Sequence, residues 1–250
     1  MKIDKVIVSS TKHRNYIDFW PIVAKAWKNI GIEPILIYTS SKKHKFHGDD
    51  SIINFHVKGI DPVFTAQNIR VLIPALFPNS VCLTSDIDIL PLSDNYFLSN
   101  IQNFSNKDFV VYRPDACPPN MLALCFNAAL GATWGEIFGV KSEEDIKTTL
   151  TNWYPKNYKR LKHGWYHDQI ILKEKLDIFS ETNNERVKIL NDDINNFNRL
   201  NRNNLSEDVK NYIEGKESFT DFHMPRPYSL YKNKINKVVS DLNNIILGVY

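Results

Sequence analysis

Apolar and polar positions fall into blocks along the first part of the chain, and these blocks predict a strand, a helix and a second strand. Residues 5–9 form a short apolar run that ends in small polar residues, which is typical of a buried strand. Residues 16–30 place apolar side chains at helical spacing, and Gly31 follows as a C-cap. Residues 33–38 form another apolar run. A strand–helix–strand unit with short connections indicates a parallel α/β sheet.

The remaining pattern extends this sheet and covers it with helices. Four further segments have the apolar runs of strands: 52–57, 80–85, 108–112 and 121–130. Five segments have the spacing or the caps of helices: 64–77, 93–99, a segment that opens at Ser142 with capping-box spacing, 167–176 and 232–247. Pro74 is expected to kink or end the first of these helices. Residues 183–204 are rich in asparagine and irregular. We therefore predict an α/β, Rossmann-like fold with a mostly parallel central sheet flanked by helices.

Composition favours one domain. The chain has 250 residues, of which 43% are hydrophobic, and no linker rich in glycine, serine or proline divides it. We therefore expect a single domain over residues 1–250. The net charge of +3 is too small for a dedicated nucleic-acid binder, so no nucleic-acid partner is expected. Small basic clusters at 42–45 and 156–162 are interpreted as solvated surface.

Cysteine usage and apolar runs indicate the compartment. The three cysteines have no C-x-x-C spacing, which argues against a disulfide framework and a zinc site. Cys82 and Cys125 lie in apolar runs and are expected to be buried. The first residues lack the hydrophobic region of a signal peptide. No apolar run reaches the ~18 residues of a membrane span. We expect a cytoplasmic protein and leave its oligomeric state open.

Asp86 and Asp88 follow the expected strand 80–85. Two carboxylates one residue apart at the mouth of a sheet can converge on one divalent cation, and oxygen ligands suit Mg²⁺ or Mn²⁺. The alternative is a solvated acidic turn or a helix cap. Ligands bind at the carboxyl ends of strands in an open parallel sheet. Residues 9–11 and Asn127, near the ends of two other expected strands, should lie at the same edge.

Several segments, taken in order, resemble the motifs of the GT-A glycosyltransferases, and most closely those of the retaining galactosyltransferase and glycogenin-like (family 8-like) group. The match runs from about residue 5 to about residue 228 and rests on five segments: 67–78 (QNIRVLIPALFP), 85–92 (SDIDILPL), 125–130 (CFNAAL), 165–172 (WYHDQIIL) and 222–228 (FHMPRPY). Two departures stand out. Ala129 replaces the family's usual glycine, and the last segment lacks a glycine and has Arg226 in place of lysine.

This resemblance implies a metal-dependent transferase that moves a sugar from a nucleoside diphosphate sugar, expected to be UDP-linked, to a glycan or other hydroxyl acceptor with retention. The implied cofactor is Mn²⁺ or Mg²⁺, and its implied ligands are Asp86, Asp88 and His223. The implied sugar-binding residues are Arg70, Asn127 and Asp168. Asp168 and Gln169 are the implied catalytic residues. The expected nucleotide-binding residues are Ser9, Thr11, Arg14, Tyr16, Asp86 and Arg226. The nucleotide-binding half would cover about 1–115, and the sugar and acceptor half about 116–250.

Each of these residues also has a simpler interpretation. Asp168 could favour the dipole of its helix, or act as general base in an inverting enzyme. Arg70 could be exposed on an amphipathic helix, and His223 could be a hydrogen-bonded surface residue. A buried Asn127 could bond to nearby backbone instead of to a sugar hydroxyl. Trp165 could stack on a sugar or pack in the core.

Two other function classes remain open. A non-catalytic nucleotide-sugar or carbohydrate-binding module could use the same scaffold. Phosphatases of the haloacid dehalogenase type also carry D-x-D after an apolar strand, with the first Asp as nucleophile. Their motif lies near the N-terminus and continues into threonine or valine, whereas here Ile89 and Leu90 follow deep in the chain. The phosphatase is therefore the less favoured alternative.

Overall fold

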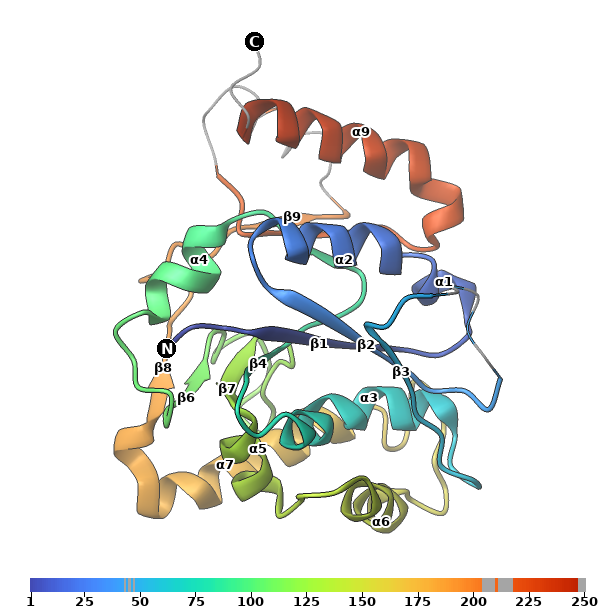
Figure 1. Cartoon of the computed structure of the whole chain (residues 1–250), viewed down its shortest axis with the longest axis vertical. Helices are drawn as coiled ribbons and strands as arrows, with labels where there is room; N and C mark the ends of the chain where they lie inside the picture. The colour runs from blue at the N-terminus through green and yellow to red at the C-terminus, as the bar shows by residue number, and fades with distance from the viewer. Residues whose placement is uncertain (43, 45, 47, 204–209, 211–217, 247–250) are drawn as a thin grey trace.

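The structure is a computed structural model that describes residues 1–42, 44, 46, 48–203, 210 and 218–246. Helices lie on both sides of a central sheet (Figure 1). On one side lies α2 (Trp20–Asn29), and on the other lie α3 (Pro62–Leu72), α5 (Gly131–Phe138) and α7 (His167–Asn183). The long helix α9 (Tyr228–Ile246) lies beyond α2 and contacts the short α1 (Arg14–Ile17). None of the described helices has both the length and the apolar character needed to cross a membrane.

Seven strands of the described residues form the central sheet, in the order β3-β2-β1-β4-β7-β6-β8. Their bounds are β1 Lys5–Ser10, β2 Glu33–Tyr38, β3 Ile52–Asn54, β4 Val81–Thr84, β6 Phe109–Val111, β7 Asn127–Leu130 and β8 Val187–Ile189. All the pairings are parallel except the two that β7 makes with β4 and β6. The predicted α/β fold with a mostly parallel sheet is therefore confirmed.

The reversed strand β7 changes how Asn127 reaches the edge of the sheet where β1 and β4 end. The sequence predicts Asn127 near the end of a strand, but Asn127 is the first residue of β7 and pairs with Thr84, the last residue of β4. Because β7 runs antiparallel to β4, its start lies beside the carboxyl end of β4. Asn127 is thus at the expected edge, but at the opposite end of its strand.

A second sheet, which the sequence did not predict, lies after the acidic turn. It contains β5 (Ile89–Pro91), β10 (Asp221–His223) and β9 (Arg199–Asn201), with β10 in the middle. His223 of β10 pairs with Ile89 of β5, directly after Asp88. This small sheet therefore brings the acidic turn together with a segment far along the chain.

Most of the expected helices form, with shifted ends. The helix expected over 16–30 is two helices, α1 and α2, because Pro21 lies in the first turn of α2, where its missing N–H costs nothing. α3 ends before Pro74, where a 3₁₀ turn, η1 (Ile73–Leu76), follows. The serine caps form as predicted at α4 (Asp94–Leu98) and α6 (Glu143–Trp153), the latter with a full capping box. α7 extends beyond the predicted 176, and α5 was not expected.

The core has one part on each face of the sheet. Along β1, Val6 and Val8 pack on the α2 side and Ile7 packs on the other side, as the alternation of strand side chains requires. Cys82 and Cys125 are buried as predicted, and Trp20 and Trp27 of α2 are buried as well. Gly131, at the start of α5, closely approaches η1, because an added Cβ would lie 2.1 Å from the Phe77 carbonyl oxygen. Only glycine fits there.

Candidate functional site

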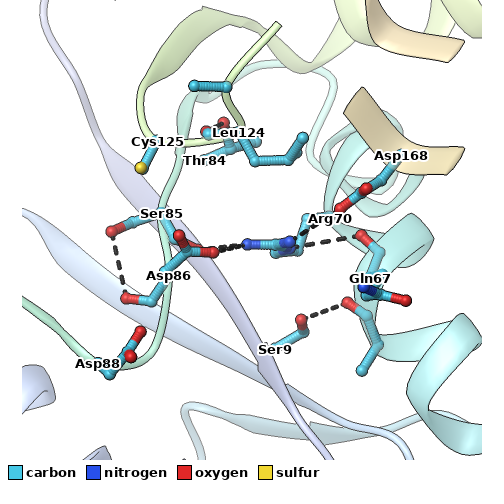
Figure 2. Close-up of polar contacts among 12 residues, drawn as sticks. Ser9, Gln67, Arg70, Thr84, Ser85, Asp86, Asp88, Leu124, Cys125 and Asp168 are labelled. Carbon is cyan, nitrogen blue, oxygen red and sulfur yellow. Dashed lines mark hydrogen bonds and ion pairs between the residues drawn. The ribbon is translucent and has the colours of Figure 1, made fainter. Parts of the chain in front are cut away.

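The Arg70 side chain, near the end of α3, joins two carboxylates from distant segments. Its Nη2 donates to Asp168 Oδ2 at 3.0 Å, and its Nη1 forms an ion pair with Asp86 Oδ1. Nη1 also donates to the Ser85 carbonyl oxygen at 3.3 Å. Figure 2 shows the guanidinium lying between Asp86 and Asp168. Arg70 is 8% exposed and Asp168 is 2% exposed, so this ion pair is buried, whereas Asp86 is half-buried. The interpretation of Arg70 as an exposed helix residue is excluded.

Burial and the facing charges shift the pKa values of this cluster in opposite directions. Burial tends to lower the pKa of Arg70, but the facing carboxylates of Asp86 and Asp168 outweigh burial and raise it. Burial also tends to raise the pKa of Asp86, yet the Arg70 guanidinium keeps it below its ordinary value. For Asp168, burial dominates and raises the pKa in spite of Arg70. Arg70 therefore keeps Asp86 ionised, while Asp168 is the more easily protonated carboxyl.

Asp88 lies apart from the Arg70 cluster (Figure 2). It contacts His223 of β10 and the following residue, Met224. Its backbone carbonyl accepts from the Met224 amide at 2.9 Å, and its Oδ2 lies 3.4 Å from His223 Nε2. This oxygen is fully buried and has no hydrogen-bond partner among the described residues. A buried carboxylate oxygen without a hydrogen bond is costly, and a cation bound to this oxygen would offset that cost.

The predicted metal ligands are brought together only in part. Asp88 Oδ2 and His223 Nε2 are neighbours, and an oxygen with an imidazole nitrogen suits Mn²⁺, so this pair fits two ligands of a divalent cation. Asp86 is instead engaged with Arg70. Within the described part of the chain, no three side chains of His, Cys, Asp or Glu stand grouped as a metal site. Asp86 would have to reorient to become the third ligand.

Arg202, which the sequence did not single out, contacts both members of this pair. Its Nη1 lies 3.6 Å from Asp88 Oδ2, and its Nη2 lies 2.7 Å from His223 Nε2. Arg226 also approaches Asp88, with Nε at 3.2 Å from the same oxygen. Arg202 follows the short strand β9 in a segment without periodicity. No pattern in the sequence could have connected it with Asp88.

Two expected nucleotide-binding residues lie at the carboxyl end of β1. The Ser9 hydroxyl donates to the Ala66 carbonyl of α3, and Thr11 Oγ1 accepts from the His13 amide at 3.2 Å. Both side chains are half-buried. They lie at the predicted sheet edge, and their role toward a nucleotide stays a prediction.

The other two N-terminal candidates differ in their surroundings. Arg14 is largely exposed and pairs with Asp18 at 3.3 Å, within one helical turn. Tyr16 accepts a hydrogen bond from Arg226 Nη1 at 2.7 Å, and the guanidinium lies 5.1 Å from the centre of the tyrosine ring. Tyr16 and Arg226 thus meet, although they lie at opposite ends of the chain, and Arg226 links Tyr16 to Asp88.

The amide of Asn127 bonds to nearby backbone. Its Nδ2 donates to the carbonyl oxygens of Ala123 at 2.7 Å and Leu124 at 3.3 Å, and the residue is fully buried. Its Oδ1 has no hydrogen-bond partner in the described structure. The nitrogen is therefore committed, and only the oxygen remains for another donor.

Asp168 and Gln169 open α7. Asp168 Oδ1 accepts from the Gln169 amide at 3.0 Å, and Gln169 Oε1 lies 3.2 Å from the Cys117 thiol. Gln169 is half-buried and Asp168 is buried. Just before this helix, the Trp165 carbonyl accepts from Gln67 Nε2 at 2.9 Å, which ties the start of α7 to α3. The first turn of α7 is therefore fixed beside Arg70.

Comparisons with known proteins give only remote structural likenesses. No protein-family model and no curated protein matches the chain. Among solved structures, it is similar to the glycosyltransferase GlyE of Streptococcus pneumoniae TIGR4, with a TM-score of 0.46 and 11% identity over 99% of this chain and 64% of GlyE. It is also similar to the galactosyltransferase LgtC in complex with donor and acceptor sugar analogs, with a TM-score of 0.45 and 9% identity over 88% of this chain and 86% of LgtC. The chain thus spans about 64% of the length of GlyE.

Proposed function

We propose that this chain is a metal-dependent glycosyltransferase. The donor would be a nucleoside diphosphate sugar, with UDP as the expected nucleotide, and the acceptor a hydroxyl group of a glycan or another molecule. Transfer with retention follows from the resemblance of the motif segments. The contacts of Arg70 carry this proposal.

Arg70 supports the proposal because it connects three of the motif segments that the sequence contains. Arg70 comes from the segment 67–78, Asp86 from the D-x-D segment and Asp168 from the segment 165–172. Arg70 and Asp168 are buried charged groups, and their ion pair offsets part of the cost of taking them out of water. A positive group held between two carboxylates at the ligand-binding edge of the sheet is suited to bind the hydroxyl groups of a sugar.

Each side chain of the site would have its own role in the proposed reaction. Asp168 would accept hydrogen bonds from sugar hydroxyls, with Arg70 fixing its orientation. Gln169 would lie near the anomeric carbon, where positive charge develops as the bond to the diphosphate breaks. Asp88 and His223 would hold Mn²⁺ or Mg²⁺, and a cation bound there would stabilise the negative charge on the leaving diphosphate.

Binding of UDP measured by calorimetry with and without Mn²⁺ tests this proposal. We expect wild-type protein to bind UDP in the presence of Mn²⁺, and Asp88→Asn to weaken binding at least about tenfold, because a charged ligand is lost. Asp177→Asn is the matched control, since Asp177 lies on α7 in an exposed pair with Lys173. Wild-type protein that binds no nucleotide with Mn²⁺ present would disprove the proposal.

A screen of nucleotide sugars followed by NMR then tests turnover. An α-linked donor that yields an α-configured product supports retention, and inversion would correct that part of the proposal. Binding of a nucleotide sugar without hydrolysis or transfer to any acceptor would favour the non-catalytic binding module.

A further inference from the structure

A cationic cavity of about 410 Å³ lies beside Asp88. Its lining contains three basic side chains from three elements: Arg202 follows β9, Arg226 follows β10, and Lys234 belongs to α9. The other lining residues are Asn203, Pro225 and Tyr231. No carboxylate belongs to this lining as far as the chain is described. The cavity therefore presents cationic donors around a space large enough for a small anionic group.

Asp88 is an incomplete counter-ion for these cations. Both guanidinium groups approach the same oxygen, Oδ2, at 3.6 Å from Arg202 and 3.2 Å from Arg226. That oxygen nevertheless accepts no hydrogen bond from either group or from any other described residue. Lys234 has no ion-pair partner among the described residues. The attraction between Asp88 and the arginines is thus ionic without a hydrogen bond. Arg202 Nη2 is bonded to His223 and Arg226 Nη1 to Tyr16, and the other N–H donors of the two guanidinium groups make no hydrogen bond to Asp88.

Arg202 also occupies the nitrogen that a metal would need. A guanidinium group can only donate, so the contact of 2.7 Å between Arg202 Nη2 and His223 Nε2 requires a lone pair on that nitrogen. The same lone pair would bind a divalent cation. Arg202 and a cation at Asp88 and His223 are therefore mutually exclusive unless the arginine side chain moves.

We propose that Arg202 is an exchangeable counter-ion of the site. Without ligands it lies against Asp88 and His223, and on binding of the donor it turns to the diphosphate, where Arg226 and Lys234 join it. This movement frees Asp88 and His223 for the cation. The inference rests on the proposed function for the identity of the anion, and it adds two residues, Arg202 and Lys234, that the motifs do not contain.

Substitution of Arg202 should shift the affinities for Mn²⁺ and for UDP in opposite directions. In Arg202→Gln, Mn²⁺ alone, measured by electron paramagnetic resonance of the free ion, should bind at least about threefold more tightly, because a competing positive charge is gone. UDP in the presence of saturating Mn²⁺ should bind about tenfold more weakly, because donors to the diphosphate are lost. Arg202→Lys should retain tighter UDP binding than Arg202→Gln, since it keeps the charge.

Lys234→Gln is the matched control, because Lys234 lines the cavity without contacting Asp88 or His223. It should weaken UDP binding and leave the affinity for Mn²⁺ alone unchanged. An Arg202→Gln variant with unchanged or weaker Mn²⁺ binding, or with unchanged UDP binding, overturns this inference and leaves the proposed function intact. Absence of UDP binding by the wild type overturns both.

Discussion

At the scale of single residues, Arg70 faces two carboxylates, and its loss would leave Asp168 buried without a counter-charge. We expect Arg70→Met to lower the free energy of unfolding by about 3–5 kcal/mol. Arg160→Met is the matched control, because Arg160 makes an exposed pair with Asp61 and should change that free energy by about 1 kcal/mol or less. Urea unfolding of both variants tests this, and equal losses would contradict it.

The charged residues of the site differ in how far the sequence could reveal them. Asp86, Asp88 and Asp168 stand in short motifs whose order along the chain is informative. Arg202 does not, because its contacts with Asp88 and His223 depend on a three-residue strand with no apolar alternation. The ion pair between Asp86 and Arg70 could not be predicted either. A D-x-D spacing allows the two carboxylates to face one cation together or to face different partners.

At the scale of elements, α5 can approach η1 closely because Gly131 has no side chain. In Gly131→Ala, the new Cβ would meet backbone of Phe77 and Pro74, which cannot rotate away. We expect a loss of about 1–3 kcal/mol or more in the free energy of unfolding. Ala132→Ser, at the exposed neighbouring position, should change this energy by less than about 1 kcal/mol. A thermal or urea unfolding curve for Gly131→Ala that matches the wild type would exclude the steric argument.

The capping box of α6 makes a pH-dependent contribution to the free energy of unfolding. Hydrogen bonds from the Lys141 amide and from Ser142 lower the pKa of Asp145 below its ordinary value of 3.8. A lowered carboxyl pKa stabilises the fold above the unfolded-state value, and this contribution is lost as pH falls through the folded-state value. Asp145→Asn should therefore destabilise at neutral pH, and the difference from wild type should shrink below pH 3.8. A difference that stays constant with pH would contradict this role.

The sequence predicted the type of an element where the pattern of apolar residues was clear, as in α3, α7 and β1. It predicted the first and last residues of the elements less well. The direction of β7 could not be read from an apolar run, because apolar runs look alike in parallel and antiparallel strands. β5, β9 and β10 have three residues each, which is too few for an alternation to be recognised. Their stability comes from pairing with one another and from contacts such as the Arg199–Asp221 ion pair, where Asp221 is fully buried.

At the scale of the whole molecule, ligand binding should raise the stability of the fold. A ligand that binds only the folded chain adds about 2.7 kcal/mol when present at about 100 times its Kd. For a chain of this length, we expect UDP with Mn²⁺ to raise the Tm by about 5–10 °C. Asp88→Asn at the same ligand concentration should show a smaller rise. No shift in wild-type Tm at UDP and Mn²⁺ concentrations that saturate calorimetric binding would contradict a site confined to the folded state.

The pairing of β10 with β5 has a consequence for how this chain can change over evolutionary time. Ile89 and His223 lie opposite each other in paired strands. This pairing sets the distance between Asp88 and His223, whatever the number of residues between the two strands. Loops between these two strands can lengthen, shorten or acquire new sequences at little cost in closure entropy. Such loops could therefore change the preference of the proposed enzyme for its substrate, as long as Arg202, which contacts Asp88 from the same stretch, keeps its place.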